Sequence, residues 1–339
     1  MLSLQRAVIW FAVALACVVG QEFAIRLAMP ELDPTKHLQF TQTQEGITLG
    51  PPNAVRRQIK NTGDFNVLIR FNELGLRDEF SLSDSTGRDF YMLGDSFAFG
   101  WGVDADDRLS NRLNGLIGPR VFNLALPGDV DTYSRMIDFA EEHGGRAERM
   151  IVALNMETDI LAYSGDASPP AANQPETRPM HIGLGQIKTL LTQYSALYFS
   201  VTRLIHRTPW LRAPAIKLGL IAPNLQAAAK HVPADTDVDA TVRRTAELAR
   251  RKQSTILVIP SRYLWFGEKS ARIARVHERL VAGLRAEGVD VVDLRPAFEA
   301  DGAPLDYHFE NDGHWRPAGH ALAAEVLAKH LRERYGDAL

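Results

Sequence analysis

A serine and a histidine far apart in this 339-residue chain are the residues best suited to do chemistry. Ser96 ends the tripeptide Gly94-Asp95-Ser96, directly after the apolar run Phe90-Tyr91-Met92-Leu93. His314 lies more than two hundred residues later, in Asp312-Gly313-His314-Trp315. A serine just past the end of a strand can be exposed as a nucleophile, and a histidine can take its proton. The pattern therefore predicts nucleophilic chemistry at Ser96.

The roles of three side chains follow from what a serine nucleophile needs. Its hydroxyl reacts poorly until a base removes the proton, and imidazole titrates near neutral pH. A carboxylate on the other ring nitrogen sets the tautomer of that imidazole. Asp312 can supply it, because its spacing of two residues from His314 suits a turn. We assign Ser96 as nucleophile, His314 as base and Asp312 as the partner of that base.

Attack on an ester carbonyl places negative charge on its oxygen, and preorganised N–H groups stabilise that charge. The amide of Ser96 is one candidate donor. The amide of Gly128 is a second, because glycine allows the backbone to approach closely. Asn155 offers a side-chain amide after a further apolar run, with the capping of a loop as the alternative role. We expect all three groups to face the same substrate oxygen.

The elements that must position these residues alternate between strands and helices. The expected strands are 90–93, 121–126, 150–154, 255–259 and 289–294, and the expected helices are 108–117, 133–142, 184–208, 238–252, 271–287 and one that begins at 317. Such alternation indicates an α/β fold with a parallel sheet covered on both faces. Reactive groups collect at the carboxyl ends of such strands, which is where Ser96, Gly128 and Asn155 fall.

Composition excludes some classes of function. The net charge of -3 gives no broad electrostatic reason to bind nucleic acid. The single cysteine, Cys17, excludes an internal disulfide and cysteine-rich zinc sites. His308, His314 and His320 are spaced by six residues, so they do not share one helix face, and we expect no metal site.

The N-terminus carries a membrane signal. Arg6 precedes an uncharged apolar stretch from Ala7 to Gly20, which is short for a spanning helix and typical of a signal peptide. Apolar residues between 23 and 29 extend it, so a tilted helix over about 5–28 can span, with Arg6 on the cytoplasmic side. We favour an uncleaved anchor over a cleaved signal, with a buried helix of a soluble protein as a further alternative.

The predicted organisation has three parts. Residues 1–29 form the anchor or signal peptide, and residues 30–88 form a lead-in segment with short paired strands at 55–59 and 65–71. Residues 89–339 form the catalytic domain, interrupted by a helical insertion at about 161–252 that begins with a proline-rich loop at 161–180. We expect the insertion to cover the active site or to contact a partner.

Three motifs carry a resemblance to a known family. Gly94-Asp95-Ser96-Phe97, the segment from Asn123 to Gly128, and Asp312-Gly313-His314-Trp315 resemble the first, second and last blocks of the SGNH (GDSL) hydrolases. Gly319-His320 and the segment from Asn72 to Asp78 are similar to bacterial members. The resemblance covers roughly residues 66–160 and 253–335.

The resemblance implies a flavodoxin-like three-layer α/β/α sandwich with a five-stranded parallel sheet, and no metal or organic cofactor. It implies the same roles for Ser96, His314 and Asp312, with Gly128 as an oxyanion donor. This sequence departs from the third block of the family, because Thr158 stands where an asparagine is usual. The hydroxyl of Thr158 has a shorter reach, and Asn155 can compensate from three residues earlier.

The implied reaction is acyl transfer through a serine acyl-enzyme, most simply hydrolysis of O-acyl groups on a carbohydrate or a cell-envelope glycan. The Asp-x-His-Trp form is also similar to periplasmic proteins that acetylate alginate and related exopolysaccharides. Two alternatives therefore stay open: an O-acyltransferase supplied by a membrane-bound acyl-donor partner, and a non-catalytic glycan-binding module. We expect a single-pass protein of the inner membrane with its catalytic domain in the periplasm, or a secreted protein if the signal is cleaved.

Overall fold

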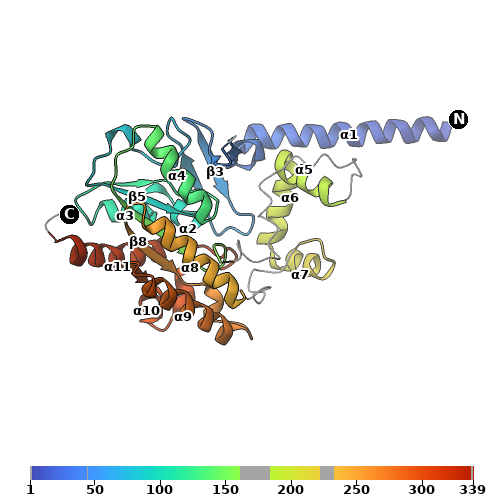
Figure 1. Ribbon diagram of the computed structural model, residues 1–339. Coiled ribbons are helices and arrows are strands. Elements are labelled where there is room, and N and C mark those ends of the chain that lie inside the picture. Colours follow the sequence, from blue (N-terminus) through green and yellow to red (C-terminus); the bar gives the residue numbers. More distant parts are fainter. Residues whose placement is uncertain (1, 44, 161–183, 222–232, 337–338) are drawn as a thin grey trace. The chain divides into compact units, whose positions relative to one another are not determined.

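The computed structural model of the protein describes residues 2–43, 45–160, 184–221, 233–336 and 339 (Figure 1). The chain divides into two compact units. The helical unit comprises Met1–Leu38, Arg56–Asn66 and Pro175–Ala222. The sheet unit comprises Gln39–Val55, Val67–Gln174 and Pro223–Leu339. The loop predicted at 161–180 lies outside the described residues.

The core of the sheet unit is a five-stranded sheet in the order β6-β5-β7-β8-β9. The strands are β5 (Phe90–Gly94), β6 (Val121–Asn123), β7 (Arg149–Asn155), β8 (Gln253–Ile259) and β9 (Val291–Asp293). All four pairings are parallel. Every residue of β5 and β7 is buried, as expected for central strands covered on both faces. The predicted fold class, with its five-stranded parallel sheet, is confirmed.

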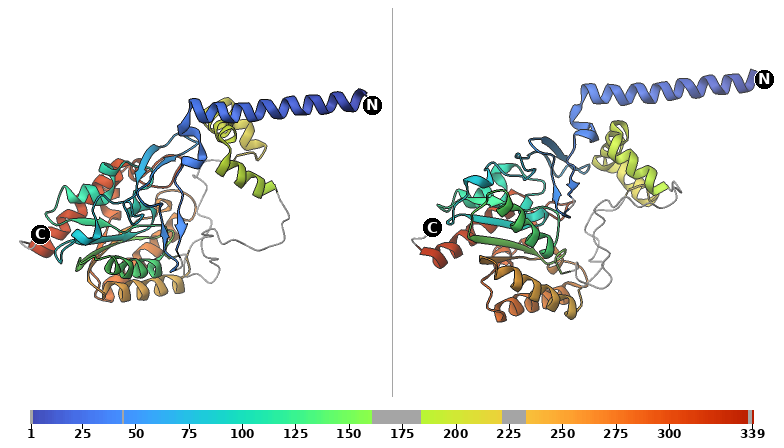
Figure 2. Two further views of the ribbon diagram at one scale, coloured as in Figure 1. Left: turned by 90° about the horizontal axis from the view of Figure 1, so that it is seen from above. Right: turned by 45° about the horizontal axis from the view of Figure 1, so that its top comes forward.

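Helices cover both faces of this sheet, which lies between them in the left view of Figure 2. On one face α3 (Leu109–Asn114) packs against α11 (Pro317–Tyr335). On the other face α8 (Asp235–Ala249) packs between α4 (Val130–Glu142) and α9 (Ser270–Ala286). The result is a three-layer sandwich whose inner helix faces are apolar.

Short elements complete the described structure. They are β1 (Thr41–Gln42), β2 (Thr48–Leu49), β3 (Val55–Ile59), β4 (Asn66–Arg70), α2 (Ser96–Phe99), α10 (Arg295–Glu299) and the 3₁₀ turns η1 (Pro30–Leu32), η2 (Pro34–Lys36), η3 (Leu82–Asp84), η4 (Ala105–Asp107), η6 (Arg262–Leu264) and η7 (Pro304–Tyr307). The strands β1 and β2 pair, and β3 pairs with β4 at the positions expected for short strands in the lead-in segment.

The second predicted strand is longer than the strand in the structure. The prediction was 121–126, but β6 ends at Asn123. The chain nevertheless keeps two backbone hydrogen bonds to β5, from the Leu124 amide to the Met92 carbonyl at 2.8 Å and from the Leu126 amide to the Gly94 carbonyl at 3.1 Å. These bonds hold the segment after β6 beside the end of β5.

The helical unit contains one long apolar helix, α1 (Leu2–Ala28). Among the described residues, its segment Leu4–Ala28 is the one helix long and apolar enough to cross a membrane, with a mean hydropathy of 2.0, and its apolar window is not buried. Such a helix is compatible with a signal anchor and with a signal peptide.

Three further helices belong to the helical unit: α5 (Leu184–Tyr194), α6 (Ala196–Arg207) and α7 (Pro209–Lys217). The prediction of a single helix over 184–208 is wrong, because Ser195 adopts an extended backbone and caps α6 by accepting the Tyr198 amide. Of the predicted insertion at about 161–252, α5 to α7 lie in the helical unit, whereas α8 lies in the sheet unit. The predicted domain limits stay a prediction.

Candidate active site

A tight turn presents Ser96 at the carboxyl end of β5. The strand ends at Gly94, whose φ of 146° is rare for residues with a side chain. A Cβ atom there would lie 2.9 Å from the carbonyl oxygen of Ala153 on β7, so the close approach of β5 and β7 requires glycine. Asp95 then caps α2 by accepting the Phe97 amide at 3.0 Å, which makes Ser96 the first helical residue.

The three side chains expected to act together do lie together. The Nε2 atom of His314 is 2.7 Å from the Oγ atom of Ser96, across 218 residues of sequence. The Nδ1 atom of His314 forms a short hydrogen bond with Asp312 Oδ1. The same carboxylate oxygen accepts the backbone amide of His314 at 3.3 Å, as expected for a turn. Hydroxyl, imidazole and carboxylate thus form one continuous chain of hydrogen bonds.

Two aromatic rings hold the imidazole plane of His314. The ring of Trp101 stacks on it with centroids 5.5 Å apart and an interplanar angle of 28°. The ring of Phe97 contacts it at 5.0 Å and 43°. From the sequence we did not expect Trp101 or Phe97 to touch the histidine, because ring stacking across such separations leaves no local pattern.

Gly128 lies in the segment that runs beside the end of β5. Because the Leu126 amide bonds to the Gly94 carbonyl, Gly128 and Ser96 each lie two residues beyond that link. A Cβ atom at position 128 would lie 2.6 Å from Cγ2 of Thr132, so the turn into α4 requires glycine. The contact of the Gly128 amide with a substrate oxygen stays a prediction.

Asn155 and Thr158 both donate hydrogen bonds to Asp95. The Nδ2 group of Asn155 and the hydroxyl of Thr158 each lie 2.8 Å from Oδ2 of that carboxylate. Asn155 is buried at the end of β7, and its Oδ1 accepts the Glu157 amide at 3.0 Å. The two side chains therefore brace the turn that carries Ser96, and their contact with an oxyanion stays a prediction.

Two more carboxyl groups lie beneath this edge of the sheet. Asp159 is fully buried. Its carboxylate accepts a hydrogen bond from the Tyr133 hydroxyl at 3.0 Å and one from the backbone amide of Asn155 at 2.7 Å. Glu157 accepts the Ser261 hydroxyl at 2.6 Å. Burial raises the pKa of Glu157 and raises the pKa of Asp159 well above its usual range. Their hydrogen bonds support the loop after β7.

The other two histidines of the C-terminal motif are buried. Burial lowers the pKa of His308 to about 4 and that of His320 to about 3, so both rings are neutral near pH 7. His320 packs edge-on against the buried ring of Trp315. Within the ranges that the structure describes, no group of three or more His, Cys, Asp or Glu side chains could hold a metal ion.

Arg77 supports the loop that carries Trp101. Its guanidinium is buried and donates to the backbone carbonyls of Phe99 at 3.0 Å and Val103 at 2.7 Å, and also to that of Gly100. In the sequence, the segment from Asn72 to Asp78 is only a motif similar to bacterial SGNH hydrolases, and nothing in it indicates a contact with residues 99–103. Only the fold shows that Arg77 acts on this loop.

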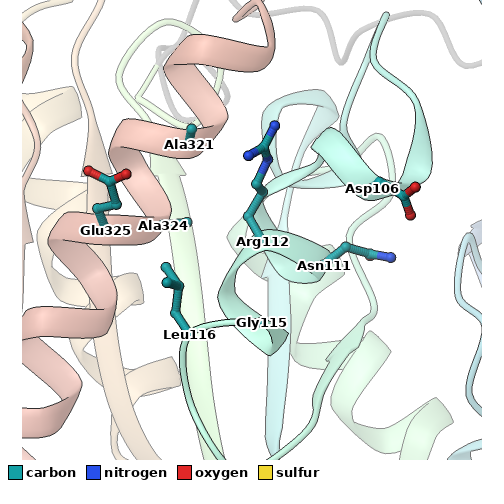
Figure 3. A pocket seen from close by; sticks show the side chains of 8 residues that line it. All are labelled: Asp106, Asn111, Arg112, Gly115, Leu116, Ala321, Ala324 and Glu325. Carbon is teal, nitrogen blue, oxygen red and sulfur yellow. The ribbon is translucent and has the colours of Figure 1, made fainter.

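A cavity of about 320 Å³ lies between α3 and α11 (Figure 3). Its lining residues are Asp106, Asn111, Arg112, Gly115, Leu116, Ala321, Ala324 and Glu325. None of the six predicted site residues lines this cavity. It is therefore separate from the candidate active site.

Residues 224–338 match the family described as the SGNH hydrolase-like domain of the acetyltransferase AlgX. The predicted resemblance to SGNH hydrolases is confirmed, and the matched part includes Asp312 and His314. No curated protein matches the chain.

Several solved structures are similar to this chain. One is a lipolytic protein of the G-D-S-L family from Veillonella parvula, with 13% identity, covering 71% of this chain and 96% of that one, at a TM-score of 0.37. A second is a lipase/acylhydrolase from Enterococcus faecalis, with 9% identity over 73% of this chain and 96% of that one, at a TM-score of 0.40. A third is a carbohydrate esterase family 2 enzyme from Corynascus thermopiles, with 13% identity over 74% of this chain and 68% of that one, at a TM-score of 0.40.

Proposed function

We propose that this protein is a serine-dependent acyl-transfer enzyme that acts on O-acyl esters of a carbohydrate or a cell-envelope glycan. The observation that carries the proposal is the continuous chain from the Ser96 hydroxyl through His314 to Asp312, with 2.7 Å between Oγ and Nε2. That separation is within the reach that proton transfer from a nucleophile requires. The match of residues 224–338 to an SGNH hydrolase-like domain supports the same class of reaction.

The proposed reaction proceeds in two halves. His314 Nε2 takes the Ser96 proton as Oγ bonds to the acyl carbon, and the amides of Ser96 and Gly128 stabilise the carbonyl oxygen as it becomes negative. The imidazolium then gives its proton to the leaving alcohol as the ester C–O bond breaks, which leaves an acyl-enzyme. An incoming hydroxyl loses its proton to His314 and attacks the acyl carbon, and Ser96 Oγ leaves with that proton. Asp312 keeps the ring oriented throughout.

The incoming hydroxyl distinguishes two versions of this function. Water makes the protein an esterase, and a sugar hydroxyl makes it an O-acyltransferase. The transferase is favoured by the description of the matched family, which names an acetyltransferase. A membrane-bound partner that supplies acyl groups belongs to this version. We further propose that α1 is an uncleaved anchor, since its segment Leu4–Ala28 is long and apolar enough to span a membrane.

The direct test is covalent labelling of the full-length protein with a fluorophosphonate. We expect the wild type to be labelled and Ser96→Ala to remain unlabelled. Ser83→Ala, which alters an exposed serine of the sheet unit, is the matched control and should be labelled like the wild type. A wild type that fails to react while folding normally would contradict the enzyme and favour the glycan-binding module.

The two versions are separated by product analysis. The enzyme is given nitrophenyl acetate with and without an oligosaccharide acceptor, and both free acetate and acetylated sugar are measured. Acetylated sugar that depends on Ser96 indicates transfer, whereas acetate alone indicates hydrolysis. Neither product above the Ser96→Ala background would contradict acyl transfer.

A further inference from the structure

The helices α5, α6 and α7, and the residues that follow α7, expose apolar and aromatic side chains. Trp210 is 74% exposed and Leu218 is 72% exposed. Other side chains with more than half of their surface exposed are Leu190, Tyr194, Leu204 and Leu220. Apolar exposure that continues over three helices marks an interaction surface more often than a free one.

The same helices carry charge of one sign only. Residues 184–221 include five basic side chains, Lys188, Arg203, Arg207, Arg212 and Lys217, and no aspartate or glutamate. Exposed tryptophan, tyrosine and leucine side chains beside lysine and arginine are typical of helices that lie in the headgroup layer of a membrane. The basic residues favour a surface that is rich in anionic lipid.

Glu22 on α1 ties α6 to the end of the apolar helix. Its carboxylate accepts the Ser195 hydroxyl at 2.9 Å, the Ala196 amide at 2.8 Å and the Leu197 amide at 2.9 Å. These amides open α6, where a carboxylate satisfies free N–H groups and complements the helix dipole. Arg26, one turn further along α1, pairs with Glu22 at 2.7 Å. Figures 1 and 2 show α6 beside this end of α1.

The position of Glu22 along α1 indicates how deep in a bilayer the contact between Glu22 and the start of α6 would lie. A hydrocarbon core of roughly 30 Å takes roughly 20 helical residues, so a span that begins at Leu4 ends close to Glu22. Glu22 and Arg26 then lie at the boundary between lipid and water, where a charged pair is tolerated. The start of α6 lies at the same level, because Glu22 caps it.

We propose that the exposed faces of α5, α6 and α7 bind the headgroup layer of an anionic phospholipid bilayer. This inference rests on the membrane anchor proposed above. Binding of these helices gives the helical unit a second, interfacial attachment beside α1. One anchor helix alone leaves the unit free to tilt, whereas an interfacial surface restricts that motion.

The test uses the full-length protein in vesicles and a fluorophore on one cysteine at a time. A label on the native Cys17, which is exposed on α1, reports insertion of the anchor. A label at Leu218→Cys in a Cys17→Ser background reports the end of α7, which Leu218 directly follows, and a label at Ala300→Cys in that background is the control on the sheet unit. Quenching by nitroxide-bearing lipids is compared in phosphatidylcholine vesicles with and without phosphatidylglycerol.

We expect the Leu218→Cys label to be quenched by lipid nitroxides in phosphatidylglycerol vesicles, and the Ala300→Cys label to be quenched only by aqueous reagents. The double reversal Arg212→Glu/Lys217→Glu should lower occupancy of the lipid-bound form on the order of tenfold. Arg272→Glu/Arg275→Glu makes the same change in net charge on exposed positions of α9 and should have no effect.

Each other outcome overturns the inference. If lipid quenches the Cys17 label but not the Leu218→Cys label, the anchor holds and the interfacial surface is wrong. If Leu218→Cys becomes shielded only after an envelope extract is added, the surface binds a protein and not lipid. If lipid does not quench the Cys17 label, the anchor fails and the inference fails with it, while fluorophosphonate labelling of Ser96 still tests the enzyme independently.

Discussion

The carboxylate of Asp95 accepts three hydrogen bonds, which connect the ends of two strands of the sheet. One comes from the Phe97 amide within the turn after β5, and two come from Asn155 and Thr158 after β7. In the sequence, Asn155 and Thr158 were alternatives for a single oxyanion donor. In the structure both point to the same carboxylate oxygen, so their shared effect is to hold the backbone next to Ser96.

Substitutions at Thr158 and Asn155 should therefore lower stability. Thr158→Val keeps the shape of the side chain but removes its donor, which should cost about 1–3 kcal/mol of unfolding free energy, measured by urea denaturation. Thr158→Ser keeps the hydroxyl and is the matched control. The oxyanion role predicts instead a loss of about 100-fold in kcat for Asn155→Ala or Thr158→Ala with stability unchanged.

Stability should fall in mild acid because of the buried histidines. Burial lowers the pKa of His320 from 6.5 to about 3, so the native ring stays neutral while the unfolded ring binds a proton below pH 6.5. The contribution of the neutral His320 ring to the free energy of unfolding is complete above pH 6.5 and is lost as the pH falls toward 3. The loss is about 2 kcal/mol by pH 5. Burial raises the pKa values of Glu157 and Asp159, so these two carboxyl groups make the free energy of unfolding rise, and not fall, as the pH is lowered.

A variant isolates this effect. His320→Phe should show a smaller loss of unfolding free energy between pH 7 and pH 5 than the wild type, measured by urea denaturation at both values. His143→Phe, on the exposed end of α4, is the control and should keep the full loss. Equal pH dependence in wild type and His320→Phe would rule out the buried ring as its source.

The loop 99–103 shows how an element far from the reacting atoms can affect them. Arg77 binds three carbonyls of this loop, and the loop carries Trp101, which stacks on His314. If the proposed function holds, Arg77 is a positioning residue that acts through Trp101 on His314. A lysine has one ammonium group and cannot reproduce the planar, forked set of donors that arginine offers.

Arg77→Lys should lower kcat on the order of tenfold and leave KM nearly unchanged, because small misplacements of a catalytic group slow the chemical step. Steady-state kinetics with a nitrophenyl ester provide the measurement. Arg88→Lys, at an exposed position before β5, is the matched control. A purely structural role for Arg77 would lower the amount of folded protein without changing kcat per folded molecule.

The break between α5 and α6 is a second case in which a distant residue shapes an element of the fold. Apolar periodicity across residues 184–208 predicted one helix, since nothing nearby in the sequence opposes its continuation. Ser195 leaves the helix because its side chain caps α6 and Glu22 satisfies the freed amides. Glu22 is more than 170 residues away, so the reason for the break cannot be read from the local sequence.

For the whole molecule, the two membrane alternatives predict different mature chains. An uncleaved anchor should give an intact mass that includes residues 2–28, and the protein should stay in the membrane fraction after extraction with carbonate. A cleaved signal would give a shorter mature chain that lacks the apolar stretch from Ala7 to Gly20, and a soluble protein. Mass spectrometry of the purified protein distinguishes the two, with Ser96→Ala as a control that should not change the outcome.

The sequence by itself determined the class of fold and the residues that meet at the end of β5. Apolar runs and amphipathic helices are local patterns, and parallel strands bring their carboxyl ends to one edge of the sheet. The tertiary structure alone decided which groups the polar side chains contact. Asn155 and Thr158 bind Asp95, Arg77 supports the Trp101 loop, and Glu22 caps α6. These contacts join residues that are distant in sequence, and hydrogen bonds over such separations depend on side-chain directions that only the packed chain defines.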